Sequence, residues 1–411
     1  MAAKNITVQK FGGSSVANAE RIMNVARRIV KTYESGNSVV VVLSAQGNTT
    51  DQLYEKAREI NPSANASKRE LDMLVSTGEQ QSVALMAMAI HSLGYNAISL
   101  NAVQVGIYAT NTHGNAHIEN IDTTRILAEL KRNNIVLVAG FQGINHNNDI
   151  TTLGRGASDT TAVALAAVLK AHVCEIYSDV DGIYTVDPRI VPSAKKLPEI
   201  CYDEMLELAF AGVQMLHGRA VEMAKRYNVQ IVVRSSMSDG GGTWIKEDVA
   251  VEQLSVSGIA IDRNVARISL IGLADEPGVA FHIFSILAKE QISVDIILRS
   301  LGHNATCDIS FTVQKEDMAT ARNLLAAHQD DIGFQSIEAD ENLAKLSVVG
   351  AGMATNSGVA AAMFEALYDC GVNIHMISTS EIKIAVLVDE RQVSKAANAV
   401  HDKFDTLKQL V

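Results

Sequence analysis

The sequence has only four cysteines, and no two are close enough to suggest a metal site or a redox pair. Cys174, Cys201, Cys307 and Cys370 lie far apart and form no CxxC motif. The histidines are also scattered, and none belongs to an HExxH motif. These absences argue against a structural zinc or another protein-built transition-metal site, and unpaired cysteines are typical of the reducing cytosol.

Long apolar runs and an excess of positive charge are missing as well. The longest apolar stretch, around residues 83–90, is interrupted at His91, so we expect no membrane-spanning helix. Residues 1–9 lead directly into a strand pattern, without the regions of a signal peptide. The net charge of −11 argues against a nucleic-acid-binding surface, and it means that an anionic substrate needs local positive charge. We therefore expect a cytoplasmic protein that binds neither nucleic acid nor membrane.

Strands and helices alternate along the first part of the chain. Apolar, largely β-branched runs predict strands at residues 6–9, 39–43, 135–138 and 174–177, and amphipathic or apolar stretches predict helices at 19–33 and 160–170. This alternation predicts an α/β fold, an α/β/α sandwich around a mostly parallel sheet. Because 411 residues are too many for one core, we expect two or three domains. The turn at residues 238–242 places the first boundary between that turn and Arg267.

The last third of the chain contains an internal repeat. Residues 267–272, 278–280 and 292–294 are similar to residues 345–350, 358–360 and 372–374. Each copy reads as strand, helix, strand, strand and helix, with the short apolar stretches at 292–294 and 372–374 as second strands. This order predicts two ferredoxin-like βαββαβ units that pack side by side in a joint sheet, where interfaces can bind a small ligand.

Glycine-rich or polar segments follow the first two predicted strands. Residues 10–15 read Lys-Phe-Gly-Gly-Ser-Ser, in which paired glycines allow close approach of an anion and Lys10 supplies a charge for phosphates. Residues 44–51 are small and polar, at the strand end where ligands usually bind in open α/β sheets. Taken alone, each segment is explained as well by an ordinary strand-to-helix turn or a capped loop.

Two other segments suggest recognition of an amino acid. Glu79 begins a long apolar helix and could accept a hydrogen bond from an ammonium group, although a charge that complements the helix dipole is the simpler explanation. Arg155 stands between small residues, so its guanidinium can bind a carboxylate through two hydrogen bonds. Ser158 and Asp159 follow at a helix start. A carboxylate there would repel phosphate unless it held a lysine, which predicts a Lys10–Asp159 ion pair.

Residues 178–189 follow another buried strand and contain several carboxylates and Arg189. The carboxylates could orient Lys10 or approach Mg²⁺ on a nucleotide, and Arg189 could meet phosphate, although turns at residues 181–182 and 187–188 are the alternative. Together, the segments supply the glycine-rich turns, cations and acids that phosphoryl transfer requires. The residues alone therefore predict a small-molecule kinase or a nucleotide-binding α/β protein.

The same motifs resemble the signatures of the aspartate kinase family. The matching segments are residues 8–16, 76–79, 138–143, 151–161 and 177–182, and the repeat resembles the family's paired ACT domains, including residues 376–381. The resemblance implies an amino-acid kinase domain at residues 1–250 and ACT domains at 265–337 and 343–411. It also implies ATP-dependent phosphorylation of the β-carboxylate of L-aspartate, the entry to lysine, threonine and methionine synthesis, with feedback inhibition at the ACT domains.

The resemblance implies roles for individual residues. In the catalytic pair, Asp159 orients Lys10. The nucleotide is bound by Lys10, Gly12, Gly13, Ser14, Ser44, Ser178, Asp179, Tyr184, Asp187 and Arg189. L-Aspartate is bound by Thr49, Glu79, Arg155 and Ser158, with Glu79 on its amino group and Arg155 on its α-carboxylate. Mg²⁺ arrives with ATP rather than in a protein-built metal site, and the substrate carboxylate needs no general base because it is already ionised.

For the ACT domains, the resemblance implies binding of lysine, threonine or both, and a homodimer through these domains. The effector residues are Asp275, Gly278, Val279, Ala280, Val294 and Asp295 in the first unit and Val359, Ala360, Asn373, Ile374, Ser380 and Glu381 in the second. Arg299 stands where relatives inhibited by lysine plus threonine have glutamine. Because arginine only donates hydrogen bonds, the identity of the effector stays open.

Two alternatives to aspartate phosphorylation also stay open. One is a kinase of the same fold for glutamate, N-acetylglutamate, carbamate or UMP, and the other is a non-catalytic amino-acid sensor. The duplicated ACT-like units argue against the first, and the intact Lys10, Glu79, Arg155 and Asp159 argue against the second. A dinucleotide-dependent oxidoreductase is excluded because the chain lacks a GxGxxG motif followed by an acidic residue.

Overall fold

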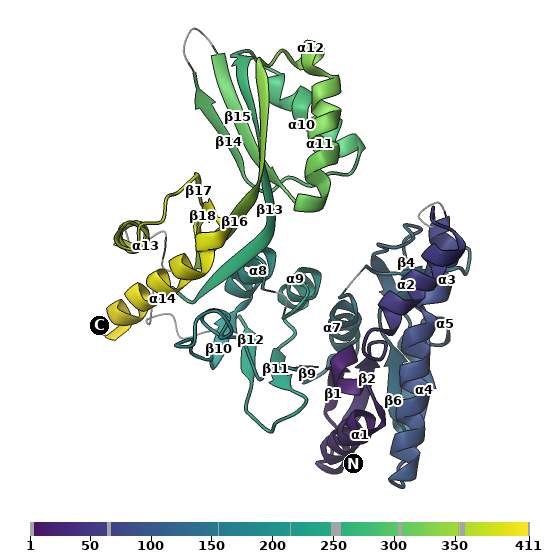
Figure 1. Cartoon of the computed structure of the whole chain (residues 1–411). Helices are drawn as coiled ribbons and strands as arrows, with labels where there is room; N and C mark the ends of the chain where they lie inside the picture. The colour runs from purple at the N-terminus through teal and green to yellow at the C-terminus, as the bar shows by residue number, and fades with distance from the viewer. Residues whose placement is uncertain are drawn as a thin grey trace. The chain divides into compact units, whose positions relative to one another are not determined.

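The computed structural model describes residues 4–63, 67–154, 156–213, 215–247, 256–302, 306–351, 353 and 358–409. The chain forms two compact units, shown in Figure 1. The first unit comprises Met1–Tyr184, Lys196–Ala209 and Gln214–Ala250, and it is called the kinase unit after the domain that the resemblance implies there. The second comprises Thr185–Lys195, Phe210–Val213 and Val251–Val411, and it is called the regulatory unit after the expected ACT domains. None of the helices in the described ranges is long and apolar enough to span a bilayer.

An eight-stranded sheet forms the centre of the kinase unit. Its strand order is β10-β12-β11-β9-β1-β2-β6-β3, and every pair of neighbours is parallel except β11 and β12. The strands are β1 (Ile6–Phe11), β2 (Ser38–Leu43), β3 (Ala97–Leu100), β6 (Ile135–Ala139), β9 (Val173–Ser178), β10 (Glu199–Cys201), β11 (Ile231–Ser235) and β12 (Thr243–Lys246). The predicted mostly parallel sheet is confirmed, and the four predicted strands correspond to β1, β2, β6 and β9.

Helices cover this sheet because the central strands are apolar on both sides. In β2, Val39, Val41 and Leu43 pack in one core with α1 (Ala19–Glu34) and α4 (Thr77–Ser92). The alternate residues of a strand point to its other face, and α7 (Ser158–Val168) contacts β1, β2 and β9. The other helices are α2 (Thr49–Ile60), α3 (Lys68–Val75), α5 (Ala102–Val105), α6 (Thr124–Lys131), α8 (Tyr202–Phe210), α9 (Gly218–Tyr227) and the 3₁₀ helix η1 (Gly13–Val16).

A small four-stranded sheet also belongs to the kinase unit. Its order is β5-β4-β7-β8, from β4 (Ile107–Ala109), β5 (Ile118–Ile121), β7 (Gln142–Ile144) and β8 (Ile150–Thr152). These strands are only three or four residues long. The sheet matters for the site because β8 ends just before the segment that contains Arg155.

The regulatory unit is built on one six-stranded antiparallel sheet of order β14-β15-β13-β16-β18-β17. Its strands are β13 (Gly258–Ala274), β14 (Ile297–Leu301), β15 (Thr306–Val313), β16 (Ser336–Val349), β17 (Met376–Thr379) and β18 (Lys383–Asp389). Its helices are α10 (Val279–Lys289), α11 (Lys315–Ala327), α12 (Gln329–Ile332), α13 (Gly358–Asp369), α14 (Val393–Gln409) and the 3₁₀ helix η3 (Glu390–Gln392). The predicted joint sheet of the two repeats is confirmed.

Two strands run through both repeats of this sheet. At its start, β13 pairs with the end of β16, from Gly258 opposite Val349 to Asp262 opposite Lys345. Further along, β13 pairs with β15 on one side and with the start of β16 on the other. The first residues of β13, 258–262, come before the first repeat in the chain, yet they pair with the part of β16 that belongs to the second repeat. The first repeat is therefore inserted into the second.

The second strand of each repeat is not where the sequence suggested. Residues 292–294 and 372–374 are not strands, and β14 and β17 begin later, at Ile297 and Met376. Ile292 N donates to Leu287 O (3.1 Å), and Val372 N donates to Leu367 O (2.9 Å), so both residues close the helix before them. Both are buried. The prediction of strands at these apolar stretches is therefore wrong, because the stretches close helix ends against the core.

Candidate active site

Three parallel strands end side by side at one edge of the kinase sheet. Phe11, the last residue of β1, lies opposite Leu43 of β2 and Tyr177 of β9. The Phe11 and Tyr177 rings stack with centroids 4.6 Å apart. The loops that follow these strands therefore meet at one place, as the sequence predicted.

Glycines allow the loops after β1 and β2 to touch. A Cβ atom on Gly13 would lie 2.5 Å from Ala45 O, so no other residue fits there without a shift of the backbone. Gly47 N donates to Gly13 O (3.0 Å), and Gly12 N donates to Tyr177 O (3.2 Å). The chain after Gly12 forms η1, and α1 begins at Ala19, where the sequence predicts the start of the first helix.

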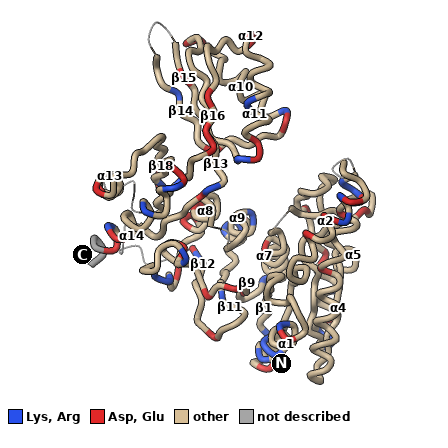
Figure 2. Tube along the Cα trace, viewed as in Figure 1, with Lys and Arg blue, Asp and Glu red and all other residues tan. Residues whose placement is uncertain are grey.

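Basic side chains follow this glycine loop. Figure 2 marks Lys and Arg positions in blue along the trace of α1, whose sequence contains Arg21, Arg27, Arg28 and Lys31. Arg21 donates to Ser14 O and so joins the helix to the loop. Arg21 therefore brings one positive charge to the glycine loop, and an acidic protein needs such local charge in order to bind an anion.

Lys10 and Asp159 form the predicted ion pair. The Lys10 Nζ and Asp159 Oδ1 atoms are 2.6 Å apart, and both side chains are largely buried, at 13% and 8% exposed. Asp159 stands in the first turn of α7, and its Oδ2 also accepts a hydrogen bond from His217 N (3.3 Å). These contacts hold Asp159, which in turn holds the Lys10 ammonium group next to Gly12.

Glu79 is a buried carboxylate with one unused oxygen. Its residue exposure is 3%, and Oε1 accepts a hydrogen bond from Ala45 N (3.1 Å) in the loop after β2. Oε2 has no hydrogen-bond partner among the residues that the structure describes. Burial raises the pKa of Glu79 to about 7, against the opposing effect of two backbone hydrogen bonds. A buried acceptor without a donor is costly in a ligand-free protein.

Of the other expected site residues, Thr49 and Ser158 of the substrate site and Ser44 of the nucleotide site have defined contacts near these loops. Thr49 begins α2, and its hydroxyl donates to Gln46 O (2.6 Å). Ser158 is buried at the start of α7, where Gly140 leaves room for its hydroxyl, since a Cβ on Gly140 would lie 2.7 Å from Ser158 Oγ. Ser44 N donates to Phe11 O (3.2 Å). Arg155 lies outside the described residues.

The segment after β9 divides between the two units. In the kinase unit, Ser178 Oγ donates to Asp179 Oδ1 (2.9 Å), and the Tyr184 hydroxyl donates to Asp181 Oδ1 (2.8 Å). Asp181 also forms an ion pair with Lys196 (3.1 Å). The carboxylate that pairs with Lys10 belongs to Asp159 and not to this segment. Asp187 and Arg189 belong to the regulatory unit, where they form an ion pair (2.7 Å) that lowers the pKa of Asp187.

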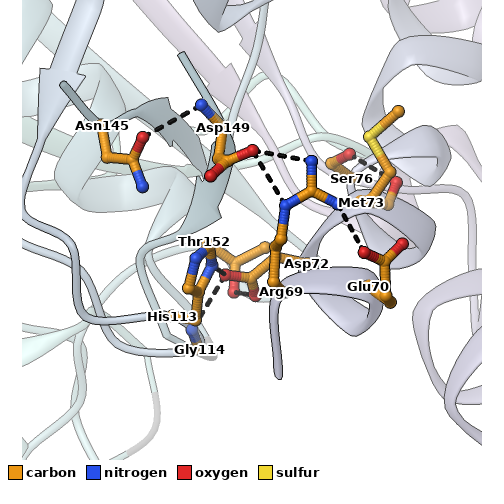
Figure 3. A network of polar contacts seen from close by, with 10 residues as sticks. All are labelled: Arg69, Glu70, Asp72, Met73, Ser76, His113, Gly114, Asn145, Asp149 and Thr152. Carbon is orange, nitrogen blue, oxygen red and sulfur yellow. Dashed lines mark hydrogen bonds and ion pairs between the residues drawn. The ribbon is translucent and has the colours of Figure 1, made fainter. Parts of the chain in front are cut away.

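Asp72 was not singled out in the sequence, yet it is the centre of a polar network (Figure 3). It is 2% exposed and accepts hydrogen bonds from His113 Nδ1 (2.8 Å), Gly114 N (3.0 Å) and Thr152 Oγ1 (2.5 Å). It thereby ties α3 to the end of β8. No local pattern marks a residue whose partners are 41 and 80 positions away.

Arg219 was missed for the same reason. It donates to Leu153 O (2.7 Å) and Ala116 O (3.0 Å), so it holds the main chain that follows β8. Gly154 and Gly156 both have positive φ angles, of 91° and 77°. Asp72 and Arg219 therefore secure the backbone on the amino-terminal side of the glycine-rich turn.

Comparison with known proteins decides the family. Residues 5–235 match the amino acid kinase family, and residues 268–329 and 346–404 match an ACT domain. The aspartokinase of Geobacillus stearothermophilus is 50% identical over 401 residues, 97% of each chain. The chain belongs to the aspartokinase family. The family, the α/β fold class with ACT domains and the phosphotransferase class predicted from the sequence are thereby confirmed.

Solved structures of the aspartokinase family have the same fold. E. coli aspartokinase III in complex with aspartate and ADP (R-state) has a TM-score of 0.83 and 26% identity, and the match covers 97% of this chain and 100% of that one. The same enzyme in complex with lysine and aspartate (T-state) has a TM-score of 0.77 and 26% identity, with 97% and 99% covered.

The first ACT repeat of this aspartokinase-family chain contains an open cavity of about 440 Å³. It is lined by Asp275, Glu276, Pro277, Gly278, Val279, Ala280, Arg299 and Ile309, which include four of the expected effector residues. Arg299 forms an ion pair with Asp275 inside it. The expected Val294 and Asp295 do not line this cavity, and Asp295 pairs with the buried Lys345 (2.5 Å).

The expected effector residues of the second repeat lie around α13 and β17. Val359 is buried in the core, and Ala360 and Ile374 pack against that core. Ser380 N donates to Lys383 O (2.8 Å) in the turn before β18, while Asn373 and Glu381 are exposed. Residues 354–357, just before α13, lie outside the described residues.

Proposed function

We propose that this chain catalyses transfer of the γ-phosphoryl group of ATP to the β-carboxylate of L-aspartate, with 4-phospho-L-aspartate and ADP as products. The observation that carries the proposal is the buried Glu79, whose Oε2 atom has no donor within the described part of the chain, at the sheet edge that also holds the Lys10–Asp159 pair. An ammonium group is the donor that such a carboxylate requires. A related enzyme binds aspartate and ADP within the same fold.

The nucleotide phosphates bind at the glycine loop. Lys10 neutralises phosphate oxygens, and Gly12, Gly13, Ser14 and Ser44 let the main chain approach them closely. The remainder of the nucleotide is bound by Ser178, Asp179, Tyr184, Asp187 and Arg189. Mg²⁺ enters as the ATP complex and is held mainly by phosphates and water. Within the described ranges, no group of three His, Cys, Asp or Glu side chains could hold a metal ion.

L-Aspartate binds between Glu79 and Arg155. Glu79 accepts the α-ammonium group, Arg155 binds the α-carboxylate, and Thr49 and Ser158 complete the pocket. The β-carboxylate then points at the γ-phosphorus, and one of its oxygens attacks while the bond to the bridging oxygen of ADP breaks. Because the nucleophile is already an anion, positioning and charge stabilisation supply the catalysis. Asp159 contributes by holding Lys10.

Feedback regulation is assigned to the ACT repeats, with lysine or threonine as effector. The cavity beside α10 supports this assignment, and E. coli aspartokinase III has been crystallised with lysine. We also propose a homodimer through these repeats. β14 is an edge strand, and its large apolar residues Ile297, Leu298 and Leu301 are exposed, as is Phe281 of α10. An edge strand with unpaired main-chain groups and exposed large apolar side chains is typical of a site where another chain adds.

The test is turnover of Mg²⁺-ATP with L-aspartate, in which hydroxylamine traps the acyl phosphate as a hydroxamate. Lysine and threonine are added singly and together. Turnover that either amino acid suppresses would support both parts of the proposal. Binding of ADP without turnover on aspartate would refute the assigned substrate, and glutamate, N-acetylglutamate and carbamate would be tested next.

A further inference from the structure

The polypeptide leaves the kinase unit after Tyr184 and returns to it at Lys196. These two residues form a β-bridge, so the segment between them, Thr185–Lys195, begins and ends at one place. Its own ends are joined as well, because Thr185 N donates to Lys195 O (2.9 Å) and Lys195 N donates to Thr185 Oγ1 (3.0 Å). The segment is therefore a loop that leaves the kinase unit and returns to it, with its two ends held together by hydrogen bonds.

The apolar side of this segment is part of the regulatory core. Val186 is 2% exposed and Val191 is fully buried, in the same cluster as Val400 and Phe404 of α14. The main chain of the segment is also bound to the regulatory unit, because Ile259 N of β13 donates to Thr185 O (2.6 Å). Apolar burial of this kind anchors the segment to the second ACT repeat.

Polar contacts along α14 hold the same segment. His401 is buried and lies between Thr185 Oγ1 (3.0 Å from Nε2) and Ser193 Oγ (3.4 Å from Nδ1). Asn398 Nδ2 donates to Ile190 O (3.2 Å). Asp405 forms an ion pair with Lys195 (2.6 Å). Three side chains on successive turns of one helix thus contact the segment along its length.

The polar side of the segment carries two residues of the proposed nucleotide site. Asp187 pairs with Arg189, whose side chain is 88% exposed. One short segment therefore joins groups assigned to ATP with the core of a repeat assigned to effector binding. Because an effector changes substrate affinity only through an element whose arrangement both ligands influence, this segment meets the structural requirement for coupling.

We propose that α14 sets the position of the Thr185–Lys195 segment and thereby the affinity for ATP, so that this helix transmits effector occupancy to the nucleotide site. Asn398 and Asp405 are the positioning residues. The inference rests on the proposed nucleotide role of Asp187 and Arg189, which the resemblance implies. It predicts that loosening α14 from the segment weakens ATP binding and leaves aspartate binding unchanged.

The experiment uses the full chain with the double substitution Asn398→Ala and Asp405→Asn, both outside the apolar core. The matched control is Lys403→Gln, which breaks an ion pair of the same helix with Glu365 of α13 (2.8 Å). We expect the double variant to raise KM for ATP about 3- to 10-fold, as expected for loss of one or two hydrogen bonds. KM for aspartate should stay constant, and the control should match the unmodified chain.

An unchanged KM for ATP in the double variant, or an equal rise in the control, would overturn the proposal. A parallel rise in KM for aspartate would do the same, since it indicates general loosening of the kinase unit. Where lysine or threonine inhibits the unmodified chain, the inhibitory concentration should rise in the double variant, and unaltered inhibition refutes the transmission role. If the unmodified chain lacks turnover, the proposed function fails, and calorimetric ADP affinity of the same three proteins still tests the positioning role.

Discussion

Replacing Glu79 by glutamine should make the ligand-free protein more stable, relative to the unmodified protein, as pH rises, and it should weaken aspartate binding. Glu79 is 3% exposed, and burial raises its pKa from 4.5 to about 7. That difference corresponds to about 3 kcal/mol of unfavourable free energy when the group is ionised in the folded state. Glutamine keeps an oxygen for Ala45 N but carries no charge.

The sign of the pH dependence follows from the raised pKa. A carboxyl group with a higher pKa in the folded than in the unfolded state binds its proton more tightly when folded. Its destabilising effect is therefore absent below about pH 4.5, grows as pH rises and is complete above about pH 7. Between about pH 5.5 and 8, the stability of Glu79→Gln relative to the unmodified protein should rise by about 2 kcal/mol.

The measurement is urea unfolding of both proteins across this pH range. Trp244, the single tryptophan, lies in the kinase unit, so its fluorescence reports on the unit that contains Glu79. The new amide NH₂ group takes the place of Oε2, which has no partner among the described residues. It adds a cost of about 1–3 kcal/mol that does not change with pH. A stability difference that stays flat with pH would refute the raised pKa.

Aspartate kinetics give the second half of this test. Because only the ionised Glu79 can pair with an ammonium group, kcat/KM for aspartate should fall about tenfold per pH unit below about pH 7. Glu79→Gln should remove this dependence and raise KM for aspartate about 10- to 100-fold, with little effect on KM for ATP. If the unmodified enzyme shows no pH dependence between about pH 6 and 8, Glu79 does not bind the substrate ammonium.

Three further substitutions test other contacts. Asp159→Asn removes the charge 2.6 Å from Lys10 Nζ, so we expect kcat to fall about 100-fold with KM for aspartate little changed, and a normal kcat would contradict the orienting role. Arg155→Ala should raise KM for aspartate far more than KM for ATP, whereas equal changes in both would remove Arg155 from its assigned role. Arg299→Gln releases Asp275 from its ion pair, so calorimetry should show tighter binding of lysine or threonine. Unchanged affinity would show that this ion pair does not limit effector binding.

The sequence predicted contacts that follow from topology. Lys10 lies one residue before the end of the parallel strand β1, and Asp159 lies in the first turn of α7, which packs on that sheet. A carboxylate beside a phosphate site needs a cation, so the sequence predicts the pair that the structure shows. The joint sheet of the repeats followed from their similarity. In each case, a local pattern and a general rule of architecture together determined the arrangement.

Other features depended on contacts that no local pattern reveals. Asp72 looks like an ordinary helix residue, and only the fold brings it to His113 and Thr152. The strands of the four-stranded sheet are too short for an alternating pattern to show. Ile292 and Val372 were taken for strand residues because a short apolar stretch does not distinguish a strand from a residue that closes a helix.

The strands β13 and β16 each run unbroken through both ACT repeats. No linker therefore separates the repeats, and a cut between them must pass through hydrogen-bonded strands in the middle of a sheet. Deleting one repeat would leave strands of the other without their hydrogen-bonded neighbours, and a repeat exchanged for that of a relative would have to match those strands. Substitutions at the pockets, such as at Arg299, change the effector site without disturbing this shared sheet.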